Sequence, residues 1–208
     1  MYIKDPMAIE TKSMEIIRAN MAPHSYSEQE LNVIKRTIHT TGDYDYQNIV
    51  RISDGAIEAG ISAIKSGCRI VTDTMMAFSG INKRSLEKAG CTIDCFISHE
   101  DIFRIAKEKQ ITRSMAAMDH AAEEGVDIFV IGNAPTALYR IGELIQEGKV
   151  APRLIIGVPV GFVGAAESKE YIRDFEVPFI TTMGTKGGSN VAAAILNAII
   201  YMAVGRDA

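Results

Sequence analysis

The sequence has few cysteines, and those present do not suit a disulfide scaffold. Three occur among 208 residues, an odd number without the spacing of a disulfide framework. Cys91 and Cys95 lie four residues apart, but no further zinc ligands follow at suitable spacing. We therefore expect three buried, reduced thiols, the third being Cys68, and no bound metal.

The sequence also lacks an excess of basic residues. It contains 22 Lys and Arg against 26 Asp and Glu, for a formal net charge of −4. A mildly acidic chain is a poor candidate for non-specific binding to DNA or RNA. If the ligand is an anion, the positive charge that binds it must be concentrated locally.

Membrane-spanning and targeting segments are missing as well. The most apolar stretch, Val191–Val204, is too short to cross a bilayer and contains Asn197. The first residues, Met1–Asp5, show no basic region followed by an apolar run, so no secretory signal is indicated. We expect a cytoplasmic protein without a membrane partner.

Short apolar segments alternate with helical patterns over most of the chain, which predicts an α/β fold. The five expected strands are Cys68–Thr72, Cys91–Ile97, Asp127–Ile131, Arg153–Val158 and Pro178–Thr182. Strands without polar alternation are buried on both faces, as in a parallel sheet with helices on both sides. The pattern predicts a three-layer, doubly wound sheet and leaves open a flavodoxin-like or a Rossmann-like strand order.

Extra helices precede this core. Pro6 opens a helix that runs to about residue 20, and Ser27 with Glu30 forms a capping box before a second helix that Gly42 ends. A third helix is expected over 54–66, after a loop over 43–53. With no linker visible, we expect one domain over 1–208, in which helices of residues 1–66 pack on a core of residues 67–208.

Glycine-rich or polar segments follow three of the expected strands, at residues 132–136, 159–164 and 184–189. Because the carboxyl ends of parallel strands share one edge of the sheet, we expect a ligand cleft there. Gly187 and Gly188 leave backbone N–H groups open at a helix start, and Lys186 adds positive charge. No Walker A spacing or dinucleotide fingerprint occurs, so a carboxylate is expected and neither ATP nor NAD. The alternative is a plain tight turn.

One of the four histidines, His39, lies in the last turn of the second expected helix. The helix dipole there favours the imidazolium, which can donate a proton and recover it near neutral pH. Arg36 lies on the same helix face, and Arg113 with Ser114 lies near the start of a later helix; arginine suits carboxylate recognition. On local grounds alone, a helix-capping role explains His39 better than catalysis does.

Several runs resemble motifs of the precorrin-8X methylmutase family, also called the cobalt-precorrin-8 methylmutases. The two most specific are Gly132–Leu138 (GNAPTAL) and Gly157–Glu170 (GVPVGFVGAAESKE). Ile38–Gly42 resembles the catalytic histidine motif. Further matches are Asp73 and Met76, Thr112–Ser114, and Lys186–Ser189 before an alanine-rich helix. The resemblance covers nearly the whole chain, in the right order.

The resemblance implies a flavodoxin-like homodimer that acts as an isomerase of cobalamin biosynthesis. Such an enzyme moves a methyl group from C-11 to C-12 of precorrin-8X or cobalt-precorrin-8, giving hydrogenobyrinate or cobyrinate, without a cofactor. His39 is then the acid, and Ser13, Arg36 and Arg113 match positions that contact substrate. The matching motifs and the expected cleft add Ser114, Asp73, Asn133, Lys186, Gly187 and Gly188 to the expected substrate-binding set.

Two other functions fit the same cleft. One is a tetrapyrrole carrier that binds without catalysis. The other is an α/β isomerase or hydrolase for a smaller carboxylated or phosphorylated compound. A hydrolase needs a nucleophile paired with a base, and Ser114 and His120, six residues apart, do not share a helix face. No residue distinguishes a metal-free substrate from one that carries cobalt.

Overall fold

A computed structural model of the chain describes residues 4–205. Its six-stranded sheet has the order β1-β6-β5-β4-β2-β3. The strands are β1 (Val50–Ile52), β2 (Arg69–Thr72), β3 (Thr92–Asp94), β4 (Ile128–Ile131), β5 (Leu154–Gly157) and β6 (Phe179–Thr182). The last five are parallel and correspond to the five expected strands. Numbered among themselves, they have the order 2-1-3-4-5 of flavodoxin-like sheets, which resolves the choice that the sequence left open.

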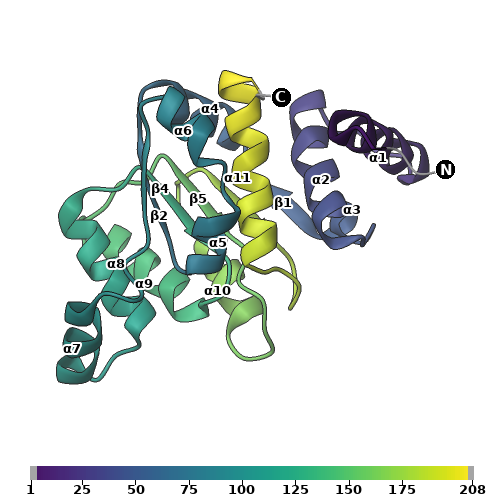
Figure 1. Cartoon of the computed structure of the whole chain (residues 1–208). Coiled ribbons are helices and arrows are strands. Elements are labelled where there is room, and N and C mark those ends of the chain that lie inside the picture. Colours follow the sequence, from purple (N-terminus) through teal and green to yellow (C-terminus); the bar gives the residue numbers. More distant parts are fainter. Residues whose placement is uncertain (1–3, 206–208) are drawn as a thin grey trace.

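Helices cover both faces of the sheet (Figure 1). They are α1 (Pro6–Asn20), α2 (Glu28–Thr41), α3 (Tyr46–Ile49), α4 (Ala56–Lys65), α5 (Met75–Gly80), α6 (Lys83–Lys88), α7 (Glu100–Lys109), α8 (Arg113–Glu124), α9 (Pro135–Gln146), α10 (Ala165–Ile172) and α11 (Ser189–Val204). Alternate residues of β4 belong to different cores. Ile128 and Val130 face the core with α2, α4 and α11, whereas Phe129 and Ile131 face the core with α8 and α9. The three-layer prediction is confirmed.

The edge of the sheet differs from the sequence prediction. Residues 43–53 were expected to form a loop, but they contain α3 and the antiparallel strand β1. The three residues of β1 pair with β6 in the register Val50↔Thr182 to Ile52↔Ile180. So short a strand has no periodicity to detect, and its partner lies far along the chain. A short antiparallel strand of this kind covers the exposed edge of β6.

The predicted helix boundaries near the N-terminus are confirmed. Ser27 and Glu30 form the reciprocal capping box, and Gly42 ends α2 with φ 67°, in the left-handed region. Gln110 also has a positive φ, 56°, and interrupts the helical stretch where a break was expected. In Figure 1, α2 lies beside α11, and α1 lies on the outer side of α2.

Several expectations concern burial and the chain ends. Cys68, Cys91 and Cys95 are buried and unbridged, with 3.7 Å between the Sγ atoms of Cys68 and Cys91. Among the helices within residues 4–205, none has both the length and the apolar character to cross a membrane. Residues 1–3 and 206–208 lie outside the described residues. They include part of the stretch inspected for a signal sequence and both ends of the expected domain.

Candidate active site

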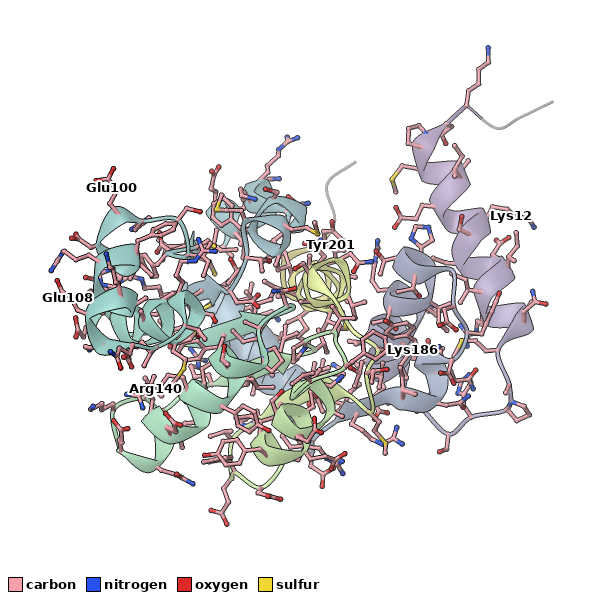
Figure 2. All side chains as sticks on the ribbon, turned by 90° about the horizontal axis from the view of Figure 1, so that it is seen from below. Lys12, Glu100, Glu108, Arg140, Lys186 and Tyr201 are labelled. Atoms are coloured by element: carbon pink, nitrogen blue, oxygen red, sulfur yellow. The ribbon has the colours of Figure 1, made fainter. Side chains whose placement is uncertain are left out.

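Loops and helix starts that expose apolar side chains follow the carboxyl ends of the parallel strands. Phe162 and Val163, after β5, are 94% and 90% exposed, and Met76, after β2, is 70% exposed. Large apolar side chains left open to water at one end of a domain mark a binding surface. Figure 2 views the molecule from below, toward the end of the sheet where these loops lie.

Asp73 lies at the switch point of the sheet, directly after β2. It is 1% exposed, and its carboxylate accepts hydrogen bonds from the backbone N–H groups of Gly132 (2.9 Å), Asn133 (2.8 Å) and Ala134 (2.8 Å). Burial raises the pKa of Asp73, while these three donors act in the opposite direction. The loop after β4 therefore already binds a carboxyl group, which belongs to the protein. Both oxygens of Asp73, which we expected to bind substrate, are engaged by the backbone, and Asn133 is left exposed beside them.

The starts of α8 and α9 bring three hydroxyl groups together. Thr112, the N-cap of α8, lies with its Oγ1 3.0 Å from Ser114 Oγ and 3.0 Å from Thr136 Oγ1, and the last two atoms are 2.9 Å apart. Arg113 projects outward, with its guanidinium carbon 4.6 Å from the centre of the Phe103 ring. Arg113 and Ser114, both expected site residues, thus lie beside polar groups that can accompany a carboxylate.

The loop after β6 has little freedom to move. A side chain on Gly187 would overlap the carbonyl oxygen of Val158, and the Gly188 N–H donates to that same oxygen at 2.9 Å. Lys186 Nζ lies 2.6 Å from Asp43 Oδ2 and 3.0 Å from Asp45 Oδ2, which raises the pKa of Lys186. The positive charge expected for the substrate is therefore paired within the protein, and it ties this loop to the segment that follows α2.

His39 is exposed in the last turn of α2, where the sequence placed it. The helix dipole was expected to favour its imidazolium, but two other effects outweigh the dipole in the folded chain. Partial burial lowers the pKa of His39, and the positive charge of Arg36 lowers it further. The imidazole is therefore mainly neutral at pH 7, and it must gain a proton before it can act as an acid.

Two side chains, Glu10 and Tyr201, stabilise the positive charge of Arg36. Its guanidinium donates to Glu10 Oε1 at 2.8 Å and lies 5.0 Å from the centre of the Tyr201 ring. These side chains line a pocket of about 240 Å³ between α1, α2 and α11. Ser13 lies one turn after Glu10 in α1, and its hydroxyl donates to the carbonyl oxygen of Ile9 at 2.8 Å. The structure thus places Ser13, Arg36 and His39 on the same pair of packed helices.

The expected site residues therefore form two groups with a link between them. Ser13, Arg36 and His39 belong to α1 and α2, whereas Asp73, Arg113, Ser114 and Asn133 belong to the β2, β4 and α8 side. The Lys186–Gly188 loop connects to the first group through Asp43 and Asp45. Figure 2 shows Lys186 on the side of α11 where α2 and α3 lie, and Glu100 and Glu108 of α7 at the opposite end.

Four residues that the sequence did not single out contribute to this arrangement. They are Asp43, Asp45, Thr136 and Lys169. Thr136 and Lys169 lie within the two specific runs, which was the available signal. Nothing local marks Asp43 and Asp45, because their partner lies more than 140 residues away.

The charge of Arg36 can be tested through the pKa of His39. Replacing Arg36 with Met should raise the pKa of His39, because it removes a cation that disfavours the imidazolium. An NMR titration of the His39 ring measures this directly. Arg18→Met is the matched control, because Arg18 also joins α1 to α2, through Glu28 at 3.0 Å, and should leave the His39 pKa unchanged. A pKa that stays the same or falls in Arg36→Met contradicts this account of the pair.

Comparison with known proteins agrees with the motifs. The precorrin-8X methylmutase family model matches residues 8–202. The cobalt-precorrin-8 methylmutase of Leptospira interrogans is 47% identical, over 93% of this chain and 92% of that protein. The Salmonella typhimurium protein of the same name is 46% identical, over 96% of this chain and 97% of that protein. The solved structure of the Thermus thermophilus precorrin-8X methyl mutase has a TM-score of 0.88 at 39% identity, and covers 97% of this chain and 98% of that one. The chain therefore belongs to the precorrin-8X methylmutase family.

Proposed function

We propose that this protein is an isomerase of cobalamin biosynthesis that moves a methyl group from C-11 to C-12 of precorrin-8X or cobalt-precorrin-8. The product is hydrogenobyrinate or cobyrinate, His39 is the acid, and no cofactor takes part. The observation that carries the proposal is an accessible histidine in the last turn of α2, one turn after Arg36. Burial lowers the pKa of His39, and the positive charge of Arg36 lowers it further. An anionic substrate can counter the effect of Arg36.

The charges of the substrate and of the Arg36–His39 pair explain how His39 gains its proton. The substrate carries several acetate and propionate groups around a flat macrocycle. Arg36 already pairs with Glu10, and a substrate carboxylate near Arg36 and His39 adds further negative charge, which favours the imidazolium and raises the pKa of His39. The proton is thus acquired when the substrate binds, and His39 becomes an acid in the complex where one is needed.

The chemical step needs only the movement of a proton and a methyl group. His39 protonates the pyrrole-type nitrogen of ring C, which makes the ring electron-poor. The methyl group then migrates with its bonding electrons from C-11 to C-12 in a 1,5-sigmatropic shift. A proton returns to His39 and leaves the more conjugated corrin. Reactant and product are isomers, so no second substrate is consumed. The protein contributes proton transfer, positioning and exclusion of water.

The distribution of positive charge suits a broad substrate better than a small one. Arg36 extends from α2, Arg113 from α8 and Lys186 from the loop after β6, so the three cations come from separate elements. Arg36 pairs with Glu10 and Lys186 with Asp43 and Asp45, so a macrocycle with carboxylates along its rim must share these cations with the acidic residues of the protein. The exposed Met76 and Phe162 offer apolar contact for its faces.

Other expectations belong to the same proposal. We infer a homodimer in which the partner covers exposed apolar residues such as Phe162 and Val163. A monomer in sedimentation at assay concentration would contradict the dimer. We also propose that residues 1–208 act as one domain, and that the reaction takes place in the cytoplasm.

The activity is tested with purified protein and one substrate. Incubation with precorrin-8X or cobalt-precorrin-8, and nothing else, should give the methyl-shifted corrin. The shift is followed by the change in absorption spectrum and by NMR of a ¹³C-labelled methyl group. A carrier would bind either compound and return it unchanged, which would refute the isomerase. Parallel kinetics on the two substrates show which of them the enzyme prefers.

A further inference from the structure

A buried lysine that the proposed mechanism does not use lies beneath the loop before α11. Lys169, in α10, is 1% exposed. Its ammonium donates to the carbonyl oxygen of Lys186 at 2.9 Å and to Thr182 Oγ1 at 3.2 Å. The neighbouring carboxylate, Glu170, pairs with Arg173 at 2.9 Å instead. An ammonium buried without a carboxylate partner is costly, and groups of this kind concentrate at functional sites.

Two donors converge on the Lys186 carbonyl. Besides Lys169, the Thr182 hydroxyl donates to this oxygen at 2.7 Å. The next two residues are Gly187, where a side chain would overlap the Val158 carbonyl, and Gly188, whose N–H donates to that carbonyl at 2.9 Å. Lys169 thus fixes the loop through the carbonyl group of Lys186, the residue directly before the two glycines.

The same loop contacts the segment that follows the His39 helix. The side chain of Lys186 pairs with Asp43 and Asp45, and the Tyr46 hydroxyl donates to the carbonyl oxygen of Gly187 at 3.4 Å. Residues 43–46 come directly after Gly42, which ends α2. The position of the Lys186 backbone therefore affects contacts at the end of the helix that carries His39.

We propose that Lys169 is a positioning residue for the methylmutase reaction: its ammonium fixes the Lys186 carbonyl and so sets the Lys186–Gly188 segment to receive a substrate carboxylate. Lys169 itself touches no substrate atom. The proposal rests on the proposed function, since it places the substrate over this loop.

The protonation of Lys169 provides a way to observe this role. Burial lowers the pKa of Lys169 to about 8, although the carboxylate of Glu170 acts in the opposite direction. β6 presents the hydroxyl of Thr182 to it, and on the loop the charge of Lys186 is paired with acidic partners. On α9, Tyr139 contacts Tyr171, on a different face of α10. The ammonium therefore loses its charge within an assayable pH range.

The test compares Lys169→Met with Lys65→Met, a change of an exposed lysine in α4. Lys169→Met should raise KM about tenfold, the factor expected for one lost charged hydrogen bond, with kcat changed less than about threefold. Lys65→Met should match the wild type. A purely structural defect would instead lower the active fraction, and so the apparent kcat, at unchanged KM. In the wild type, KM should rise as the pH passes about 8, and Lys169→Met should lack this rise.

A folded Lys169→Met with wild-type KM overturns the proposal, and so does a wild-type KM that is flat from about pH 7 to 9. If Lys169→Met does not fold, Thr182→Val removes the second donor to the same carbonyl and should raise KM in the same direction; an unchanged KM counts against the proposal.

Wild-type protein without turnover refutes the proposed function instead. Hydrogen exchange at the Gly188 amide still tests Lys169 in that case, because exchange should be faster in Lys169→Met, and an unchanged rate overturns the proposal.

Discussion

Replacing His39 with Asn should lower kcat by about 10²–10⁴-fold, the usual contribution of one general acid, while substrate still binds. Asn cannot carry the proton, but it is similar in size and can still donate a hydrogen bond. His39 is exposed at the end of α2, so its loss should leave folding intact. Stopped-flow absorption gives kcat, and fluorescence or absorption titration gives affinity. A carrier would show no turnover in either form.

The matched control is His24→Asn. His24 is exposed in the loop between α1 and α2, with its ring centre 5.1 Å from that of Tyr26, and it should be dispensable for turnover. A His39→Asn enzyme with wild-type kcat would remove His39 from the mechanism, even if the isomerase activity itself were established.

The pH dependence of the wild-type enzyme gives the same hypothesis a second observable. An acid is active when protonated, so activity falls as the pH rises through its pKa. The profile of kcat/KM reports the free enzyme, in which burial and Arg36 lower the pKa of His39. The profile of kcat reports the complex, in which substrate carboxylates offset Arg36. The alkaline limb of kcat should therefore lie at higher pH than that of kcat/KM.

Much of the core could be predicted because its signal is local. Strands such as Ile128–Ile131 are buried along their whole length, and an unbroken apolar run records this directly. The Ser27 capping box and Gly42 are also local signals, because each involves residues within one helical turn. The order of the strands is different. It depends on which crossovers cover which face, and no single segment encodes it.

The site was harder to predict, because its electrostatics depend on contacts between distant segments. The dipole argument for His39 was sound for an isolated helix, but burial and Arg36 outweigh it in the folded chain. Lys186 carries the expected charge, yet its two carboxylate partners belong to a segment that was assigned to a loop. Residue types were predictable at these positions, whereas their partners were not.

Replacing Asp73 with Ala should destabilise the fold by about 3 kcal/mol, because three backbone N–H groups, those of Gly132, Asn133 and Ala134, lose their carboxyl acceptor. The carboxylate is 1% exposed and joins the end of β2 to the loop after β4, so no water can readily take its place. Asp73→Asn should recover only part of this loss. Its amide oxygen can still accept, but its NH₂ group would face the N–H donors of Asn133 or Ala134. Urea unfolding followed by circular dichroism measures these changes.

Asp94→Asn, at the end of the neighbouring strand, is the control for the loss of stability in Asp73→Ala. Asp94 ends β3 and pairs with Arg69 at 3.4 Å, but its side chain is 40% exposed, so the change should cost at most about 1 kcal/mol. The contrast separates a carboxylate that binds backbone at the switch point from one that only forms a surface ion pair. If Asp73→Ala were as stable as Asp94→Asn, the loop after β4 would not depend on this carboxyl group, and its three hydrogen bonds would not explain why Asp73 lies at the switch point of the sheet.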